Sequence, residues 1–139
     1  MKEGHALEIR GYCYSMREEW DEAIKIFEEV HRLTNHPLKG LAPLGYAYAK
    51  TGQTDKAMEC ITKVGQRETE EPGFVKEPDL ALIWWGLGDK DKAFECLFIA
   101  LDKRMPVIYG LYSPLYEGVI EDPRFDEIKR RLNLPVEVS

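Results

Sequence analysis

The sequence predicts an all-α fold, an α-solenoid in which antiparallel helix pairs stack on one another. The first observation is an echo: DEAIKIFEEV at 21–30 is followed by DKAMECITKV at 55–64 and by DKAFECLFIA at 91–100. The second is the spacing, because the shared alanine recurs after 34 and then after 36 residues. The third is the apolar pattern of each copy, which has the period of a helix. Self-similarity at such an interval is the signature of a repeat architecture.

These intervals divide the whole chain. We expect one domain over residues 1–139, with copies at about 4–37, about 38–73 and about 74–106, and a capping segment at about 107–135. Each copy has the pattern of two amphipathic helices joined by a tight turn. The stacked copies should therefore bury one continuous core.

The second copy shows the expected elements in order. LKGLAPLGYAYAK forms the first helix, TGQT the turn and DKAMECITKVGQ the second helix. Gly52 tolerates the left-handed conformation that ends the first helix, and Thr54 or Asp55 can cap the second. The same order of elements is expected in the other two copies.

Small residues recur where the two helices of a pair should cross. Two antiparallel helices can approach closely only where neither backbone carries a bulky side chain, and larger side chains then fill the space around the contact. The small residues are Gly11, Gly45 and Ala81 on the first helices and Ala23, Ala57 and Ala93 on the second. The larger ones are Tyr14, Tyr48, Trp84, Phe27, Ile61 and Leu97.

Together these positions resemble the tetratricopeptide repeat, whose pattern is W-x₂-L-G-x₂-Y, then A-x₃-F, then P, on a 34-residue period. The opening Trp is absent from all three copies. The second copy fits best, through Leu41, Leu44, Gly45, Tyr48, Ala57 and Ile61. The resemblance implies a right-handed superhelix whose first helices line a concave groove.

The last segment, about 107–135, is expected to close the solenoid. Asp122 and Pro123 are typical of a helix start, and Phe125, Ile128 and Leu132 then fall on one face. The segment is similar to the closing helices that follow such repeats in bacterial regulatory proteins. Its aromatic stretch, with Tyr109, Tyr112, Tyr116, Leu111 and Leu115, could fold into the concave face or present a surface for self-association, and packing between the terminal helices is the default expectation.

The composition limits the classes of partner that we expect. The net charge of −6 and a pI near 5.2 disfavour nucleic acid, because a phosphate backbone would be repelled on average. LALIWW at 80–85 is the longest apolar run and is far shorter than the ~20 residues of a membrane span. The N-terminal residues lack a secretory h-region, so we expect a cytoplasmic protein without membrane contact.

The sequence offers no constellation for catalysis, a metal or a cofactor. His31 lies near Glu28 and Glu29, but it falls at the end of a predicted helix and is read as solvated. Cys60 and Cys96 occupy the same slot in successive copies; helical layers 8–10 Å apart exceed the ~7 Å limit for bridged Cα atoms, so packing thiols are expected. We therefore expect a protein that is not an enzyme.

The resemblance implies which side chains face the groove. It places there Glu8, Tyr12, Met16, Lys39, Tyr46, Lys50, Leu82 and Trp85, together with His5, Ser15, Ala42 and Ala49. Aromatic anchors in a preorganised groove suit an extended peptide or an inserted helix. Some chaperone-associated members clamp a carboxylate with Lys, Asn and Arg; here those places hold Glu8, Tyr12, Pro43 and Asp79, so the clamp is absent.

The expected function is a non-catalytic protein–protein interaction module or scaffold that binds a peptide or partner surface in the groove. The alternative is a self-associating assembly subunit, a homodimer formed through the groove or through the first helix, which no cap precedes. A small-ligand sensor or an enzyme would need a closed polar pocket, for which the sequence shows no strong constellation.

Overall fold

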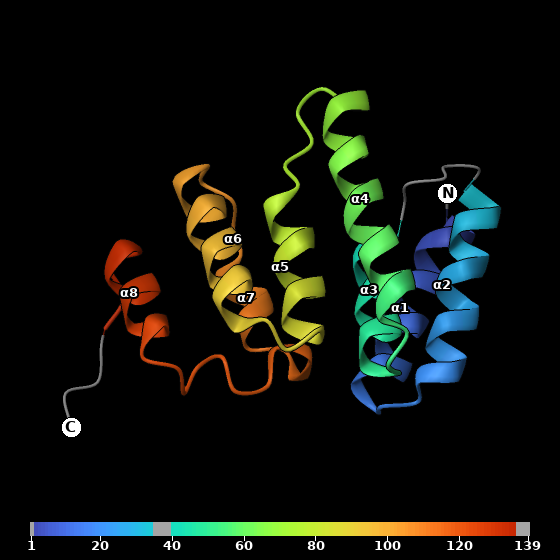
Figure 1. Ribbon diagram of the computed structural model, residues 1–139, viewed down its shortest axis with the longest axis horizontal. Coiled ribbons are helices and arrows are strands. Elements are labelled where there is room, and N and C mark those ends of the chain that lie inside the picture. Colours follow the sequence, from blue (N-terminus) through green and yellow to red (C-terminus); the bar gives the residue numbers. More distant parts are fainter. Residues whose placement is uncertain (1, 35–39, 136–139) are drawn as a thin grey trace.

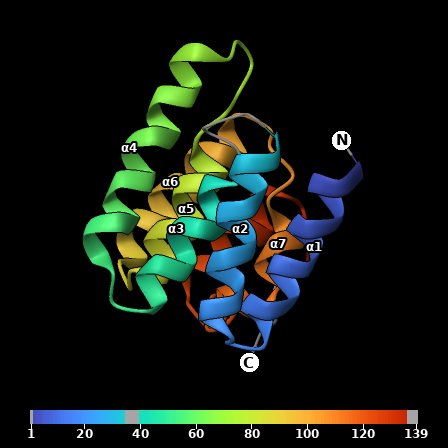
Figure 2. The ribbon, with the colours of Figure 1, turned by 90° about the vertical axis from the view of Figure 1, so that its right-hand side faces the viewer.

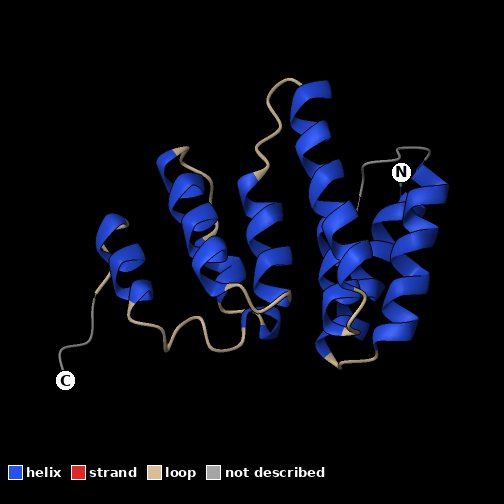
Figure 3. Ribbon diagram, viewed as in Figure 1, coloured by secondary structure: helices blue, strands red, loops and turns tan. Residues whose placement is uncertain are grey.

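The computed structural model describes residues 2–34 and 40–135, and its regular structure in these ranges is entirely helical (Figures 1 and 3). This confirms the predicted all-α fold. The helices are α1 (Lys2–Met16), α2 (Trp20–Thr34), α3 (Leu41–Lys50), α4 (Thr54–Glu70), α5 (Glu77–Gly86), α6 (Lys90–Asp102), α7 (Ile108–Leu111), the 3₁₀ helix η1 (Pro114–Tyr116) and α8 (Arg124–Arg131).

Three helix pairs, α1/α2, α3/α4 and α5/α6, follow one another along the long axis of the molecule (Figure 1). Seen from the α1/α2 end, the later pairs lie behind the first (Figure 2). α3 packs against both α2 and α5, which joins the pairs into one stack, and α8 packs against α6 beyond the last pair. This is the translational self-similarity of the predicted α-solenoid.

The turn inside each pair repeats in detail. A left-handed residue occupies the same place in each copy: Glu18 at φ 60°, Gly52 at φ 80° and Gly88 at φ 83°. The next N–H then donates to the carbonyl of the aromatic residue five positions earlier, as in a Schellman motif. These bonds are Glu19 to Tyr14 (2.9 Å), Gln53 to Tyr48 (2.8 Å) and Asp89 to Trp84 (3.0 Å). The prediction for Gly52 is confirmed.

The capping prediction for the second copy was wrong by one or two residues. α4 begins at Thr54 itself, so Gln53 is the N-cap and makes no side-chain cap bond. The left-handed turn fixes the residue that follows it as the cap. In the third copy that residue is Asp89, whose side chain accepts a 3.1 Å hydrogen bond from the Lys92 N–H.

The helices of each pair cross at small residues, as predicted. Ala23, Ala57, Ala81 and Ala93 are fully buried. A Cβ added at Gly11 would lie 2.7 Å from the Phe27 ring. Two clusters of buried side chains result: one lies between the first two pairs and reaches Ile83 of α5, and the other joins α3, α5 and α6 to the C-terminal segment.

The closing segment largely follows the sequence prediction. The Asp122 side chain accepts a 2.9 Å hydrogen bond from the Arg124 N–H, and Pro123 immediately precedes α8. Phe125 and Ile128 are buried. Leu132 follows the last turn of α8 and is exposed, so the expectation that it shares the buried face was wrong.

The close crossing at Gly45 predicts a stability effect. A Cβ there would lie 2.9 Å from two side-chain carbons of Ile83 and 3.0 Å from the Cys60 Cβ. Gly45→Ala is expected to lower the free energy of unfolding by about 1–3 kcal/mol, since overpacking forces the helices apart. Gly65→Ala in α4 meets no atom within 4 Å and should raise it by about 0.5–1 kcal/mol. Urea denaturation measures both, and equal effects would contradict the close contact.

Candidate functional site on the inner face

The C-terminal segment covers part of the face that the sequence predicts as a groove. We call inner face the surface of α1, α3 and α5 on which residues 107–119 lie; η1 contacts both α1 and α5 there. The Tyr46 hydroxyl donates a 2.6 Å hydrogen bond to the backbone carbonyl of Leu115. The Trp85 and Tyr116 rings are 5.9 Å apart, and Leu115 and Tyr116 are buried. Leu115 and Tyr116 of the aromatic stretch thus fold into the inner face, which is one of the arrangements that the sequence left open.

The rest of the aromatic stretch does not share this burial. Tyr112 is exposed, although its ring edge contacts Phe125 at a centroid distance of 5.9 Å. The Tyr109 side chain lies outside the described residues. The segment thus inserts mainly its leucines and Tyr116 into the inner face.

The predicted groove residues fall into three groups. Tyr46, Leu82 and Trp85 are buried beneath the C-terminal segment or within the core cluster that it joins. Glu8 and Tyr12 are half-buried on α1, whereas Met16 and Lys50 are exposed. Lys39 lies outside the described residues, as does the side chain of His5. That these residues contact a partner stays a prediction.

Three of them, Met16, Tyr46 and Lys50, meet at one opening, which we call the open end of the inner face. It is a cavity of about 190 Å³ between α1, the start of α2, α3 and η1. Lys50 Nζ lies 5.7 Å from the centroid of the Tyr46 ring, which in turn lies 5.7 Å from the Trp20 ring. The remaining lining residues are Ser15, Glu18, Trp20, Pro114, Leu115 and Glu117.

The open end offers several kinds of contact. Ser15 is buried, and its Oγ has no hydrogen-bond partner among the described residues. A buried hydroxyl without a partner is costly, so a ligand that supplied one would gain free energy. Lys50 provides a cation, Glu18 and Glu117 provide carboxylates, and Met16 provides an adaptable apolar side chain. Such a mixture suits a protein segment.

Titratable groups gather beneath the C-terminal segment. Burial raises the pKa of Asp79 from its ordinary value of 3.8 to about 6; the Glu8 carboxylate adds to this, and the Arg67 guanidinium opposes it. Burial, and then the charges of Glu8 and Asp79, raise the pKa of the Tyr12 phenol. Burial also raises the pKa of Tyr46 to about 12. At a given pH, a larger fraction of each of these groups is therefore protonated and neutral than it would be in water.

Other chemistry finds little support in the described part of the chain. No group of three or more His, Cys, Asp and Glu side chains in it is placed to hold a metal ion. Cys13, Cys60 and Cys96 are all free thiols, in agreement with the packing role predicted for Cys60 and Cys96. None of the described helices combines the length and apolar character that crossing a bilayer requires.

Sequence reasoning left open whether the C-terminal segment folds into the inner face, and it missed the contribution of the α1–α2 turn to the open end. Pro114, Leu115 and Glu117 follow no repeat, so no interval could assign them to the inner face. Trp20 precedes the echoed segment and has no counterpart in the later copies, where Thr54 and Lys90 stand at the matching positions. The only feature of the sequence that could have drawn attention to Trp20 is that it is an aromatic residue at the start of a helix.

Comparison with protein families gives two matches. Models of the tetratricopeptide repeat match residues 5–33 and residues 41–64. The first range holds most of α1 and α2, and the second holds α3 and the first part of α4. Comparisons with curated proteins and with solved structures give no significant match.

The raised pKa of Asp79 predicts a pH dependence. Between about pH 4 and pH 6 the folded protein keeps a proton that the unfolded chain has released, so this contribution to stability is lost as the pH rises to about 6. Asp79→Asn removes the titration. Its gain in unfolding free energy over the parent protein should therefore grow across this window and reach about 1–3 kcal/mol at pH 7.

Urea denaturation at a series of pH values measures this difference. Asp21→Asn, at an exposed aspartate in the first turn of α2, controls for the loss of one negative charge. A difference that did not change with pH, or that matched the control, would contradict the raised pKa of Asp79.

Proposed function

The chain is a tetratricopeptide-repeat protein, and from this premise we propose that it is a non-catalytic interaction module that binds a peptide or a partner surface at its inner face. Repeats of this family are generally protein–protein interaction modules and typically act as scaffolds without catalysis. The observation that carries the proposal is the Tyr46 hydrogen bond to the Leu115 carbonyl, at 2.6 Å. Here the inner face already holds an irregular chain segment through one backbone contact and buried side chains.

The partner is proposed to contact the open end. Tyr46, Leu82 and Trp85 are buried, whereas Met16 and Lys50 are exposed next to the C-terminal segment. A partner segment at the open end would extend the path of the C-terminal segment toward α1. Because the helices are already ordered, binding would not have to supply the free energy of ordering the receptor.

The same reasoning bears on the class of partner and on location. A net charge of −6 supports a protein partner over nucleic acid. Free thiols at the buried Cys60 and half-buried Cys96 are consistent with the reducing cytoplasm, which we propose as the location. No cofactor enters the proposed mechanism, which is the rigid presentation of side chains.

The open end predicts a loss of binding on mutation. Met16→Glu should reduce partner capture at least tenfold, because a partner contact there would have to desolvate a carboxylate beside Glu18. The matched control is Met58→Glu on α4: both methionines are similarly exposed, at 46% and 41%, but Met58 does not line the open end.

The measurement is affinity capture from the native cell with the full chain, followed by titration of the purified captured protein. Circular dichroism melts show whether both variants keep the fold. Equal affinities of the two variants for the same partner would refute the open end as the contact surface.

Self-association is a second candidate function, supported by the exposed edge of α1. Ile9 and Cys13 lie on this edge and are exposed. One interval later the corresponding residues are Pro43 and Ala47, both buried. In the third copy, the counterpart of Cys13 is Ile83, also buried. The same helix face is thus covered by a preceding pair in two copies and uncovered in the first, which a second molecule could cover.

Sedimentation tests the second candidate. If α1 mediates a homodimer, Ile9→Glu should convert it to a monomer, because the carboxylate would be buried in the interface. Ile99→Glu is the control on α6: the two isoleucines are 53% and 37% exposed, and only Ile9 is on the α1 edge. The runs contain reductant so that Cys13 cannot cross-link molecules. A parent protein that stays monomeric up to millimolar concentration would reject the candidate.

A further inference from the structure

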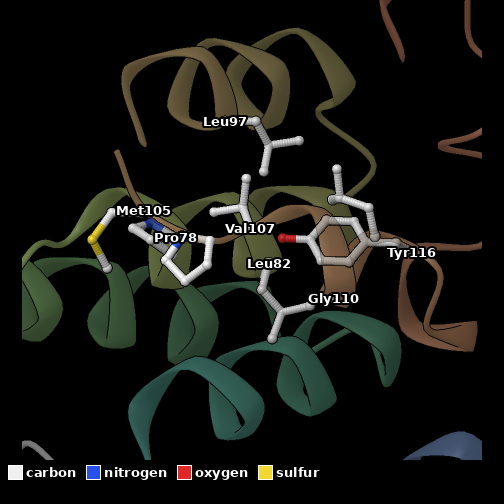
Figure 4. A pocket seen from close by; sticks show the side chains of 9 residues that line it. Pro78, Leu82, Leu97, Met105, Val107, Gly110 and Tyr116 are labelled. Carbon is white, nitrogen blue, oxygen red and sulfur yellow. The ribbon is translucent and has the colours of Figure 1, made fainter. Parts of the chain in front are cut away.

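An apolar cavity lies apart from the open end, between α5, α6 and the start of the C-terminal segment (Figure 4). Its volume is about 250 Å³. No charged side chain lines it; the lining residues are Pro78, Leu82, Leu97, Met105, Pro106, Val107, Gly110, Leu111 and Tyr116. A dry apolar cavity of about 150 Å³ already binds benzene, so this one can hold a substituted ring.

Among the side chains that line this cavity, the Tyr116 hydroxyl is the one oxygen or nitrogen group. Figure 4 shows it directed from the ring toward Val107, between Leu82 and Leu97. Tyr116 is only 8% exposed, and its hydroxyl donates no hydrogen bond to the other described residues. Tyr46, the other buried tyrosine that contacts this segment, does have a partner, the Leu115 carbonyl. The Tyr116 hydroxyl is therefore free to donate a hydrogen bond to a ligand in the cavity.

The surroundings decide what could complete that bond. The pKa of Tyr116 is raised, first by burial and then by the charge of Asp79, so the hydroxyl stays protonated and can donate. The same carboxylate, with no cation in the cavity lining, disfavours an anionic ligand. Hydrocarbon walls disfavour any charged or strongly polar ligand. What fits is an uncharged ring with one acceptor.

We propose that this cavity binds a neutral, ring-sized and otherwise apolar compound with one carbonyl oxygen, which accepts a hydrogen bond from the Tyr116 hydroxyl. This site is separate from the proposed partner contact at the open end, and neither requires the other. The two sites share the C-terminal segment, because Leu115 lines the open end and Tyr116 lines the cavity. An occupied cavity would therefore favour the segment's position on the inner face.

Two probes of nearly equal shape test the proposal on the full-length chain. Acetophenone carries the carbonyl, and α-methylstyrene replaces its oxygen with a methylene group. Both are titrated while the methyl signals of Leu82, Leu97 and Val107 are followed by NMR. We expect saturable shifts of these methyls with both probes, and about 2- to 12-fold tighter binding of acetophenone, which corresponds to one neutral hydrogen bond.

Two variants assign the effect to the cavity. Tyr116→Phe keeps the ring against Trp85 and should remove the preference for acetophenone, whereas Tyr112→Phe, at an exposed tyrosine outside the cavity lining, should leave it unchanged. Gly110→Leu adds a side chain at a lining position where a Cβ meets no atom within 4 Å, and it should weaken both probes.

Three results would overturn the proposal. These are the absence of saturable binding of either probe to the parent protein, shifts that do not centre on the lining methyls, and a preference for acetophenone that survives Tyr116→Phe. A cavity that admits only an apolar side chain of a partner protein would give the first result. None of these outcomes bears on Met16, so the proposed function is tested separately.

Discussion

Close packing of helices around small residues is the constraint on which the rest of the structure depends. A Cβ at Gly11 would meet the Phe27 ring of α2, and a Cβ at Gly45 would meet Ile83 of α5 and Cys60 of α4, while Ala23 and Ala57 are fully buried. A left-handed turn residue then reverses the chain within a few residues. Because no pair buries its apolar faces alone, the pairs must stack on one another. Copies that are one interval apart in the sequence therefore occupy successive layers of the stack.

Stacking leaves an inner face that is rich in aromatic side chains. Exposing such a face to water would be unfavourable. Leu115 and Tyr116 of the C-terminal segment cover the central part of this face. Burying their side chains stabilises the fold, but it also leaves polar groups in unfavourable surroundings. Asp79 is held in surroundings that disfavour its charge, and the buried Ser15 hydroxyl lacks a partner among the described residues. The Ser15 hydroxyl lies at the edge of the cover, where it lines the open end. Natural proteins tolerate such costs chiefly at functional sites.

The sequence was sufficient for the fold because the evidence was local and repeated: every copy has its own small residues, turn and apolar period. The same reasoning selected Tyr46 as a groove anchor but could not identify its hydrogen-bond partner, because Leu115 lies 69 residues away in a segment without periodicity. The apolar cavity could not be predicted from the sequence either. Its lining includes Met105 and Val107, which follow the end of α6 in a connection that no pattern in the sequence specifies.

The two ends of the stack differ in how far their described residues are buried. Phe125 and Ile128 of α8 are buried against the last pair, so that end has its cover. At the other end Ile9 is exposed at a position whose counterpart Pro43 is buried. Met16 of the open end belongs to the same helix. α1 therefore carries both the uncovered edge and one wall of the open end, so a second molecule on its edge would stand next to any partner bound at the open end, and the two associations would influence each other through this one helix.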